Sequence, residues 1–392
     1  MKILDKFLED AVLSLDKNDL KRELKNVLGP QGPSIYIEGK EVLNFCSNNY
    51  LGLAARDSLK HAAIDCIEEE GVGSSASRLV CGNMAAHQKL EQKIADFKGK
   101  EKCLLFSTGY MANVGIISSL FSRDDIIFSD RLNHASIVDG ILLSQAKLKR
   151  YPHLCMKTLE EMLKREQSGN KKVIITDSVF SMDGDIAPLD KIVELAKKYN
   201  CSVMIDEAHA LGVMGKNGRG LAEYFDVEKD IDIQMGTLSK AIGCFGAYVV
   251  GSSNLVSFLI NKARSFVYTT GMPPAIAAAA LKSFEIIEED SSLKTKLWEN
   301  TRYLQQALKD LGFDTMNSQT PIIPILVKDA KKAVELSKAL FKEGIFISAI
   351  RPPTVPKDTA RLRLTVMATH KKKDLDFLVD KIRKEGKKLC LI

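Results

Sequence analysis

The sequence predicts an α/β protein with a mostly parallel sheet of seven strands and a second, smaller α/β unit toward the C-terminus. The first observation behind this prediction is that short apolar segments alternate with helix-length amphipathic segments between residues 100 and 250. Such alternation is typical of parallel strands whose connecting helices cover both faces of a sheet. The second observation is that the pattern changes after Gly271-Met-Pro-Pro274, where long helical segments replace the alternation of short strands and helices. Sheets of this kind bind ligands beyond the carboxyl ends of their strands.

Each strand of the main sheet is expected to be a short run of mostly apolar residues. We expect these strands at residues 102–106, 125–129, 147–151, 173–177, 202–206, 231–235 and 247–250. Helices are expected between most of them, for example at residues 189–199. In the C-terminal unit we expect helices at residues 275–290, 293–311, 330–342 and 372–389, and strands at residues 322–327, 346–350 and 360–366.

The N-terminal segment, up to about residue 30, is expected to form a helical arm, because its apolar residues recur at helical spacing. A β-hairpin is expected at residues 34–45, with its turn at Glu38-Gly-Lys40. A chain of 392 residues exceeds the size of most single hydrophobic cores, which is about 250–300 residues. We therefore expect an arm at residues 1–45, a large unit at residues 46–285 and a small unit at residues 286–392, with the second boundary inside a helix.

Composition and charge exclude several classes of function. Hydrophobic residues make up 45% of the chain and charged residues 27%, and no apolar run reaches the roughly 18 residues of a membrane span. Acidic residues near the N-terminus are not typical of a signal peptide, so we expect a soluble, cytoplasmic protein. The net charge of +6 is spread along the chain, which does not favour nucleic-acid binding. The eight cysteines include no C-x-x-C pair, so no metal site is predicted.

Lys240 is the first candidate functional residue. It lies in the turn Gly236-Thr-Leu-Ser-Lys240-Ala-Ile-Gly243, directly after the expected strand at residues 231–235. A lone lysine in a turn is usually a surface charge. A lysine that is partly removed from water has a lowered pKa, however, and reacts with carbonyl groups as a nucleophile. Thr237, in the same turn, offers a hydroxyl group to a phosphate beside such a carbonyl.

Asp206 and His209 follow another expected strand, at residues 202–206. If this strand lies beside the one that precedes Lys240, a carboxylate, an imidazole and an amine meet at one edge of the sheet. An aspartate in this place can simply cap the next helix. Alternatively, it can keep a pyridine nitrogen protonated, so that the ring withdraws electrons from a bound substrate, while His209 contacts the phenolic oxygen. This combination favours pyridoxal 5'-phosphate (PLP) as the cofactor.

Further turns contribute candidates of their own. His134 follows an expected strand, where its ring can stack on an aromatic cofactor or serve a structural purpose. Gly109 and Tyr110 begin an expected helix, and the N–H groups of a helix N-terminus suit a phosphate. Arg351 lies in Arg351-Pro-Pro-Thr354-Val-Pro356, a loop stiffened by three prolines. A fixed arginine there can bind a carboxylate through two hydrogen bonds, or the loop can be a structural corner.

Other familiar motifs are absent or out of context. Gly71-Val-Gly73-Ser-Ser-Ala76 imitates a dinucleotide fingerprint, but it follows an expected helix rather than a strand. The sequence contains no Walker A motif, no H-E-x-x-H and no G-x-S-x-G. It therefore gives no support to an ATPase, a zinc hydrolase or a serine esterase.

Together these motifs resemble the α-oxoamine synthase family of fold-type I PLP enzymes, and the resemblance covers nearly the whole chain. The segments that carry it are Asn44-Phe-Cys-Ser-Asn48-Asn-Tyr-Leu-Gly52, Asp130-Arg-Leu-Asn-His134-Ala-Ser136, Val179-Phe-Ser181-Met-Asp-Gly-Asp185, Asp206-Glu-Ala-His209, Gly236-Thr-Leu-Ser-Lys240 and Ala349-Ile-Arg-Pro-Pro-Thr-Val-Pro356. The resemblance implies an aspartate aminotransferase-like, fold-type I transferase. It also implies PLP as the cofactor and a homodimer with its active site at the subunit interface.

The resemblance also implies roles for single residues. Lys240 is expected to hold PLP as a Schiff base and, with His134, to be catalytic. The expected cofactor ligands are Gly109, Tyr110, His134, Ser181, Asp206, His209, Thr237, Lys240 and Thr270 of the partner subunit. The expected substrate ligands are Arg22, Asn48, His134, Arg351 and Thr354.

Within this family, residues 349–356 and 359–365 are most similar to the branch that joins L-alanine to pimeloyl-CoA or a pimeloyl-carrier protein, with loss of CO2, in biotin synthesis. The nearest alternatives use glycine with a short acyl-CoA, as 2-amino-3-oxobutyrate CoA ligase and 5-aminolevulinate synthase do. A regulator that senses PLP without catalysis is an alternative of another class. Such a regulator would be expected to carry a DNA-binding domain, for which the 45 or so residues before the core give no room.

Overall fold

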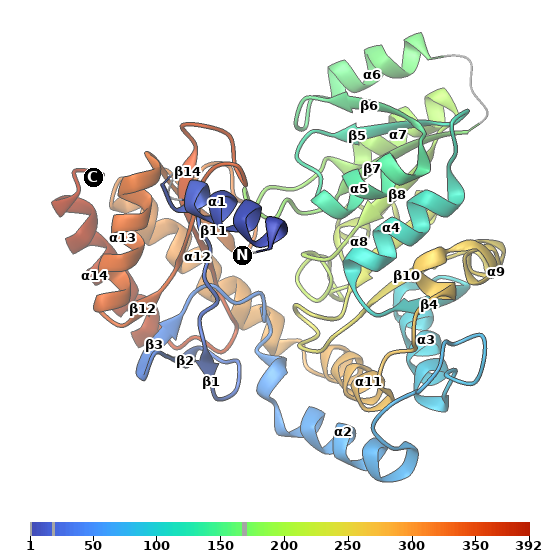
Figure 1. The fold of residues 1–392 in the computed structure, drawn as a ribbon, viewed down its shortest axis with the longest axis horizontal. Helices are drawn as coiled ribbons and strands as arrows, with labels where there is room; N and C mark the ends of the chain where they lie inside the picture. The colour runs from blue at the N-terminus through green and yellow to red at the C-terminus, as the bar shows by residue number, and fades with distance from the viewer. Residues whose placement is uncertain (1, 18–19, 167–170) are drawn as a thin grey trace.

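The computed structural model describes residues 2–17, 20–166 and 171–392. The chain forms two lobes, which are separate in Figure 1. The lobe on the right contains the main sheet, and the lobe on the left contains the C-terminal unit together with an N-terminal hairpin. Residues 1, 18 and 19 of the expected arm lie outside the described residues. Within the described ranges, no helix combines the length and the apolar composition that crossing a bilayer requires.

The main sheet has seven strands in the order β4-β10-β9-β8-β7-β5-β6. All are parallel except β10, which runs antiparallel to both β4 and β9, so the predicted mostly parallel sheet is confirmed. The predicted strand at residues 231–235 begins two residues later, as β9, and therefore extends to Thr237. The strands are β4 (Lys102–Phe106), β5 (Ile126–Asp130), β6 (Lys147–Tyr151), β7 (Lys172–Asp177), β8 (Ser202–Asp206), β9 (Ile233–Thr237) and β10 (Ala247–Gly251).

Helices cover both faces of this sheet (Figure 1). On one face, Ile116 and Ile137 pack against strand residues such as Val173, and on the other face Ile192 packs against Ile174. Both faces are consequently apolar, and polar side chains are left to the strand ends. The helices are α2 (Asp57–Glu70), α3 (Ala85–Lys98), α4 (Gly109–Leu120), α5 (Ala135–Ser144), α6 (Met156–Arg165), α7 (Leu189–Tyr199), α8 (Leu221–Tyr224), α9 (Ser253–Lys262) and α10 (Arg264–Val267).

The C-terminal unit is an antiparallel sheet, ordered β11-β14-β13, that packs against helices. The predicted single strand at residues 346–350 is wrong, because the chain changes sheets at the buried Ile347. Before it, β12 pairs with the N-terminal strand β3, and after it β13 pairs with β14. The elements are α11 (Pro274–Glu289), α12 (Ser292–Asp310), β11 (Ile322–Lys328), α13 (Ala330–Lys342), β12 (Ile345–Phe346), β13 (Ser348–Ile350), β14 (Ala360–Thr365) and α14 (Lys372–Lys388).

The N-terminal arm is helical over half of its expected length, in α1 (Ile3–Lys17). Residues 20–26 form no helix, because their side chains bind the C-terminal unit and the hairpin instead, as Arg22 does with Thr354 and Lys25 with Glu38. After β1 (Val27–Leu28), the predicted hairpin is present as β2 (Ser34–Ile37) and β3 (Lys40–Asn44). Since β3 also pairs with β12, the hairpin belongs to the left lobe. The division of the chain at residues 45 and 285 stays a prediction.

Candidate active site

A cavity of about 130 Å³ lies at the carboxyl ends of the parallel strands of the main sheet. It is lined by turns that follow β4, β5, β7, β8 and β9. Strands β7, β8 and β9 are neighbours, so their last residues are brought to one edge of the sheet, as expected for an α/β protein. Eight predicted site residues line this cavity, namely Gly109, Tyr110, His134, Ser181, Asp206, His209, Thr237 and Lys240.

Lys240 reaches this cavity from the turn after β9. The turn closes with a hydrogen bond of 2.9 Å from the N–H of Gly243 to the carbonyl of Lys240. Gly243 has a φ of 72°, and a Cβ atom there would lie 2.5 Å from the backbone nitrogen of Ala54, so only glycine fits. Burial lowers the pKa of Lys240 to about 8, although the carboxylates of Asp206 and Asp177 oppose the shift. An amine with this pKa is partly neutral near pH 7 and can act as a nucleophile.

The carboxylate of Asp206 is held by two hydrogen bonds. Asn113, from α4, donates its Nδ2–H to one oxygen at 2.8 Å, and the N–H of Ala208 donates to the other at 2.8 Å. The amide of Asn113 also donates to the hydroxyl of Ser136, on α5, at 2.9 Å. Among the described residues, the Oδ1 atom of Asn113 is buried without a hydrogen-bond partner. This side of the cavity therefore offers hydrogen-bond acceptors to a ligand with an N–H or O–H group.

His134 is positioned by both its backbone and its ring. Its N–H donates to the carboxylate of Asp177 at 2.8 Å, and its Nδ1 atom lies 2.8 Å from the hydroxyl of Ser136. Burial, followed by the negative charge of Asp206, raises the pKa of Asp177 well above its usual range. No role was predicted for Asp177, Asn113 or Ser136, although Asp177 ends an expected strand and the other two follow expected strands. His134 lines the cavity and is exposed to solvent.

A chain of hydrogen bonds continues from His209 to the C-terminal unit. The Nδ1 atom of His209 lies 2.7 Å from the hydroxyl of Tyr50, which lies 3.4 Å from the Oδ1 atom of Asn48. Arg363, on β14, donates to the same Asn48 oxygen at 3.1 Å and to the carbonyl of Ser181 at 2.5 Å. Burial lowers the pKa of His209 well below its usual range and raises the pKa of Tyr50 to about 12. Both groups are therefore neutral near pH 7.

Arg363 and Tyr50 are site residues that were not predicted from the sequence. Arg363 is only 7% exposed and its neighbour on the same face of β14, Arg361, is 2% exposed. Arg361 forms an ion pair of 2.7 Å with Asp183, so both arginines hold the turn that contains Ser181. The feature of the sequence that could have revealed Arg363 is a pair of arginines, two positions apart, within an otherwise apolar strand. Buried arginines in such a strand require acceptors from another part of the chain.

The remaining predicted site residues do not line the Lys240 cavity. Arg22, Arg351 and Thr354 line a separate cavity of about 820 Å³ between residues 20–25 and α13. There, the guanidinium of Arg22 donates to the hydroxyl of Thr354 at 3.3 Å. Thr270 is exposed and pairs with Ser77 through an isolated β-bridge. Asn48 lines neither cavity but takes part in the chain of hydrogen bonds from His209.

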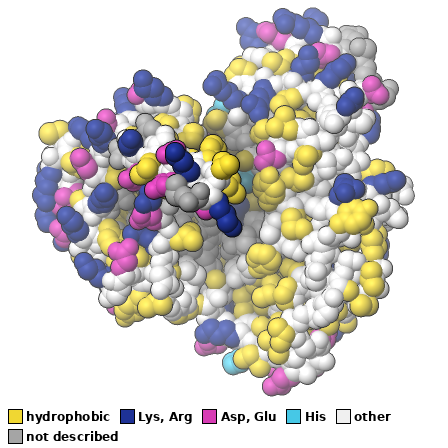
Figure 2. Space-filling view, in the orientation of Figure 1, with side chains coloured by type: hydrophobic (Ala, Val, Ile, Leu, Met, Phe, Trp, Pro, Cys, Tyr) yellow, Lys and Arg dark blue, Asp and Glu magenta, His cyan; other side chains and the backbone are white. Residues whose placement is uncertain are grey.

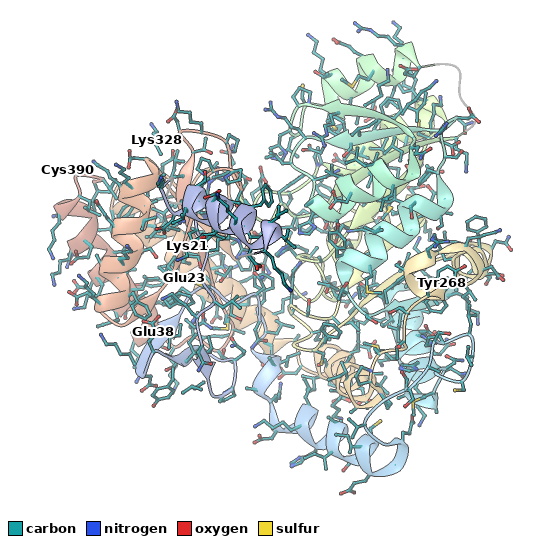
Figure 3. All side chains as sticks on the ribbon, viewed as in Figure 1. Lys21, Glu23, Glu38, Tyr268, Lys328 and Cys390 are labelled. Atoms are coloured by element: carbon teal, nitrogen blue, oxygen red, sulfur yellow. The ribbon has the colours of Figure 1, made fainter. Side chains whose placement is uncertain are left out.

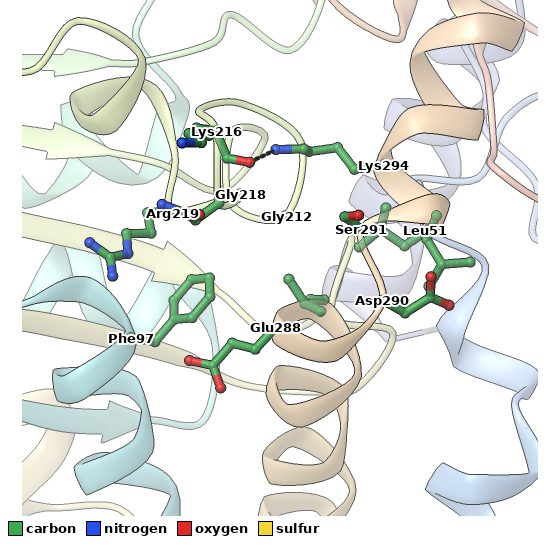
Figure 4. A pocket seen from close by; sticks show the side chains of 13 residues that line it. Leu51, Phe97, Gly212, Lys216, Gly218, Arg219, Glu288, Asp290, Ser291 and Lys294 are labelled. Atoms are coloured by element: carbon green, nitrogen blue, oxygen red, sulfur yellow. Dashed lines mark hydrogen bonds between the residues drawn. The ribbon is translucent and has the colours of Figure 1, made fainter.

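A third cavity, of about 330 Å³, lies between the loop at residues 212–219 and the junction of α11 and α12 (Figure 4). Lys294 closes one side by donating to the backbone carbonyls of Gly215, at 2.5 Å, and of Lys216. None of the predicted site residues lines this cavity. The cavity that contains Lys240 is therefore the candidate active site.

Comparison with known proteins agrees with this geometry. A family model described as aminotransferase class I and II matches residues 40–382. A protein named 8-amino-7-oxononanoate synthase from Geobacter sulfurreducens is 49% identical over 380 residues, which cover 96% of this chain and 97% of that protein. The chain belongs to the class I and II aminotransferase family, in the 8-amino-7-oxononanoate synthase group.

Solved structures in this family share the whole fold. Serine palmitoyltransferase from S. paucimobilis, solved with PLP bound as an adduct with myriocin, covers 100% of both chains with a TM-score of 0.94 and 30% identity. A structure of 8-amino-7-oxononanoate synthase from Francisella tularensis covers 88% of this chain and 98% of that chain, with a TM-score of 0.77 and 33% identity. The predicted fold-type I transferase is thereby confirmed.

The donors and acceptors of the Lys240 cavity fit PLP. An amine of lowered pKa suits its aldehyde, and a carboxylate held by two hydrogen bonds suits its ring nitrogen. The unpaired Oδ1 atom of Asn113 adds a second acceptor on the side of Asp206. At the other side of the cavity, the hydroxyl of Thr237 and the N-terminus of α4 at Gly109 suit a phosphate.

Proposed function

We propose that this enzyme uses PLP to join L-alanine to the acyl group of pimeloyl-CoA or a pimeloyl-carrier protein. The products are 8-amino-7-oxononanoate, CO2 and the free thiol of the carrier, a step of biotin synthesis. The observation that carries this proposal is that the amine of Lys240 has a lowered pKa and shares one cavity with the carboxylate of Asp206. We infer the reaction itself from the name of the relatives, 8-amino-7-oxononanoate synthase.

When bound, PLP supplies an aldehyde that carries the nitrogen of the amino acid and a ring that withdraws electrons from its Cα atom. Lys240 would hold the cofactor through its amine, and the same amine, when free, would be the base that takes the Cα proton of the amino acid. Asp206 would keep the ring nitrogen protonated, since its carboxylate is fixed by Asn113 and Ala208. His209, which is neutral, would donate a hydrogen bond to the phenolic oxygen from its Nε2 atom, because Tyr50 occupies Nδ1.

Two arginines are candidates for the carboxylate of the amino acid. We assign this role to Arg363, because its guanidinium binds the carbonyl of Ser181, a residue of the Lys240 cavity. Its positive charge also contributes to the lowered pKa of Lys240. Arg351, the candidate from the sequence, lines the other cavity with Arg22 and Thr354, and we assign it to the acyl thioester. His134, which lines the Lys240 cavity and is exposed to solvent, is our candidate for the proton donor to the thioester oxygen.

We further propose that the active enzyme is a cytoplasmic homodimer. Val72, Leu79, Val80 and Tyr268 are between 50% and 79% exposed, although they are large and apolar. They flank Thr270, which lies beside residues 74–77 through the bridge to Ser77 and the hydrogen bond from Gly271 to Ala76. Hydrophobic side chains gather on the right lobe in Figure 2. A second copy that covers this surface would bring Thr270 of the partner subunit to the phosphate.

The experiment that tests the function is mass spectrometry of the product formed from L-alanine or glycine with a panel of acyl thioesters. We expect 8-amino-7-oxononanoate from alanine and a pimeloyl thioester. Product from glycine and acetyl-CoA alone would instead establish the activity of 2-amino-3-oxobutyrate CoA ligase.

The Lys240→Ala variant tests the role of the amine. It is expected to lose the visible absorbance of bound PLP in Schiff-base linkage, together with on the order of 10³-fold or more of the turnover. Lys216→Ala, which removes an exposed lysine of the cavity in Figure 4, is the matched control and should keep both. Full activity of Lys240→Ala would exclude the scheme.

A further inference from the structure

Two oppositely charged side chains are buried together just outside the Lys240 cavity. Most charged residues lie on the surface, as Glu38 and Lys328 do on the left lobe in Figure 3. Lys98, the last residue of α3, is only 1% exposed, and Glu207, the first residue after β8, is 0% exposed. The amine of Lys98 forms an ion pair with the carboxylate of Glu207. Neither side chain lines the Lys240 cavity.

The surrounding backbone completes the hydrogen bonds of this ion pair. Lys98 also donates to the carbonyl of Arg219. The second carboxylate oxygen of Glu207 accepts from the N–H of Ala222 at 3.0 Å. Gly220 has a φ of 121°, and a Cβ atom there would collide with the carboxylate of Glu207, so only glycine fits. Both oxygens of the buried carboxylate therefore have partners, and the carboxylate ties α3 to the loop before α8.

A buried ion pair of this kind contributes little to stability, because moving both charges out of water offsets most of their attraction. Removing only one partner is strongly destabilising, since the other charge is then left buried and unpaired. What the pair does fix is the position of the two segments that carry it, the end of α3 and the end of β8.

Glu207 is linked to the cofactor site through the backbone. Its N–H continues the pairing of β8 with β9 by donating to the carbonyl of Met235 at 2.7 Å. Successive side chains of an extended chain point to opposite faces, so Asp206 lines the Lys240 cavity while Glu207 faces α3. The N–H that binds the Oδ1 atom of Asp206 at 2.8 Å is that of Ala208, in the peptide bond that begins at Glu207. Fixing Glu207 therefore also fixes the peptide that orients the Asp206 carboxylate.

We propose that the ion pair of Lys98 with Glu207 is a positioning element, which holds the carboxylate of Asp206 in the orientation that binds the ring nitrogen of PLP. This inference rests on the role proposed for Asp206. Lys98 and Glu207 act through Asp206 and not on the cofactor itself. Without the pair, the peptide bond after Glu207 can turn, and the Asp206 carboxylate loses one of its two hydrogen bonds. The ring of PLP is then bound less tightly and its nitrogen is less fully protonated.

The first test is the Lys98→Met variant. Equilibrium release of PLP from the holoenzyme gives the Kd of the cofactor, and the visible spectrum is recorded as a function of pH. We expect the Kd for PLP to rise about tenfold, because a charge-assisted hydrogen bond between a carboxylate and a protonated nitrogen depends on its geometry. The pH at which the spectrum changes should shift as well.

The double variant Lys98→Met/Glu207→Gln separates position from stability. Lys98→Met alone leaves the charge of Glu207 buried and unpaired, and it is therefore expected to unfold at a lower temperature. In the double variant no charge is left unpaired, and glutamine can still accept from the N–H of Ala222. We expect the double variant to recover thermal stability but to keep the raised Kd and the shifted spectrum, because the tie to α3 is still missing.

Lys100→Met is the matched control. Lys100 is half-buried and ties the same end of α3 to the carbonyls of Glu228 and Ile231, at 2.7 and 2.8 Å. It should lose stability but keep the wild-type Kd and spectrum. A wild-type Kd and spectrum in the double variant would overturn the proposal, as would an equal rise of the Kd in the control. Failure of the double variant to fold would assign the pair to stability alone and overturn the proposal too.

Asp206→Asn distinguishes failure of this inference from failure of the role on which it rests. If Asp206→Asn binds PLP with the wild-type Kd and spectrum, the role proposed for Asp206 is itself wrong. If Asp206→Asn is impaired while the Lys98 variants are not, only the positioning role is wrong.

Discussion

Replacing Tyr50 with phenylalanine removes one hydroxyl group from the chain of hydrogen bonds that ends at His209. The hydroxyl lies 2.7 Å from the Nδ1 atom of His209 but 3.4 Å from the oxygen of Asn48, so the contact with the histidine is the shorter and stronger of the two. Asn48 keeps its bond from Arg363 in the variant. The loss therefore falls on His209, whose Nδ1 atom is left buried without a partner and free to take the proton from Nε2.

The size of the effect follows from that unpaired nitrogen. Leaving a buried polar group unsatisfied costs about 1–3 kcal/mol. If the hydrogen bond from His209 to the cofactor is needed in the transition state, this energy lowers kcat about 5- to 150-fold. The visible spectrum of the holoenzyme and its change with pH should shift too, because we assign that hydrogen bond to the phenolic oxygen of PLP.

The matched control for this variant is Tyr248→Phe. Tyr248 is also fully buried, on β10, but among the described residues its hydroxyl has no hydrogen-bond partner. Its loss should therefore change kcat by less than about twofold. The reasoning is refuted if Tyr50→Phe retains both the wild-type kcat and the wild-type spectrum, or if both variants lose activity equally.

Two further predictions concern side chains that bind the turn at residues 181–185. Arg363→Lys should raise the KM for alanine by about tenfold, since lysine cannot bind Ser181 and Asn48 with one planar group. Arg351→Lys should leave this KM unchanged. The same alanine KM in both variants would contradict the assignment of the carboxylate to Arg363. Burial opposes protonation of His153, but its hydrogen bonds to Asp130 and Asp185, at 2.9 Å each, raise its pKa to about 10. Because this pKa is raised in the folded state, the pH-dependent advantage of the wild type over His153→Gln should reach up to about 5 kcal/mol below pH 6.5 and should disappear as the pH rises through 10. Thermal unfolding of both proteins between pH 6 and 10 measures it, and a constant difference would argue against the two ion pairs.

The parts of the fold and site that could be predicted from the sequence depend on local pattern and on one general rule. Each strand of the main sheet is a local run of apolar residues, so its position was predicted to within two residues. Ligands of parallel sheets lie at the strand ends, and this rule was enough to predict that Asp206, His209 and Lys240 meet. Their convergence needs only that β8 and β9 be neighbours, which the structure confirms.

The parts that could not be predicted depend on how distant segments dock. Arg363 lies more than 120 residues beyond Lys240, in another lobe, and no local pattern gives the direction of its guanidinium. The segment at residues 20–26 has helical composition, yet contacts such as that of Arg22 with Thr354 hold it extended. Strand 346–350 was predicted as one unit because its apolar run is continuous, whereas its two halves belong to different sheets.

The position of Arg361 and Arg363 links the two lobes. Both side chains belong to the left lobe, but Asp183 and Ser181, which they bind, belong to the lobe with the main sheet. These bonds therefore hold the two lobes together beside the Lys240 cavity. If the lobes moved apart, the positive charge of Arg363, which helps to lower the pKa of the Lys240 amine, would move away from that amine. Contact between the lobes therefore helps to keep the amine reactive.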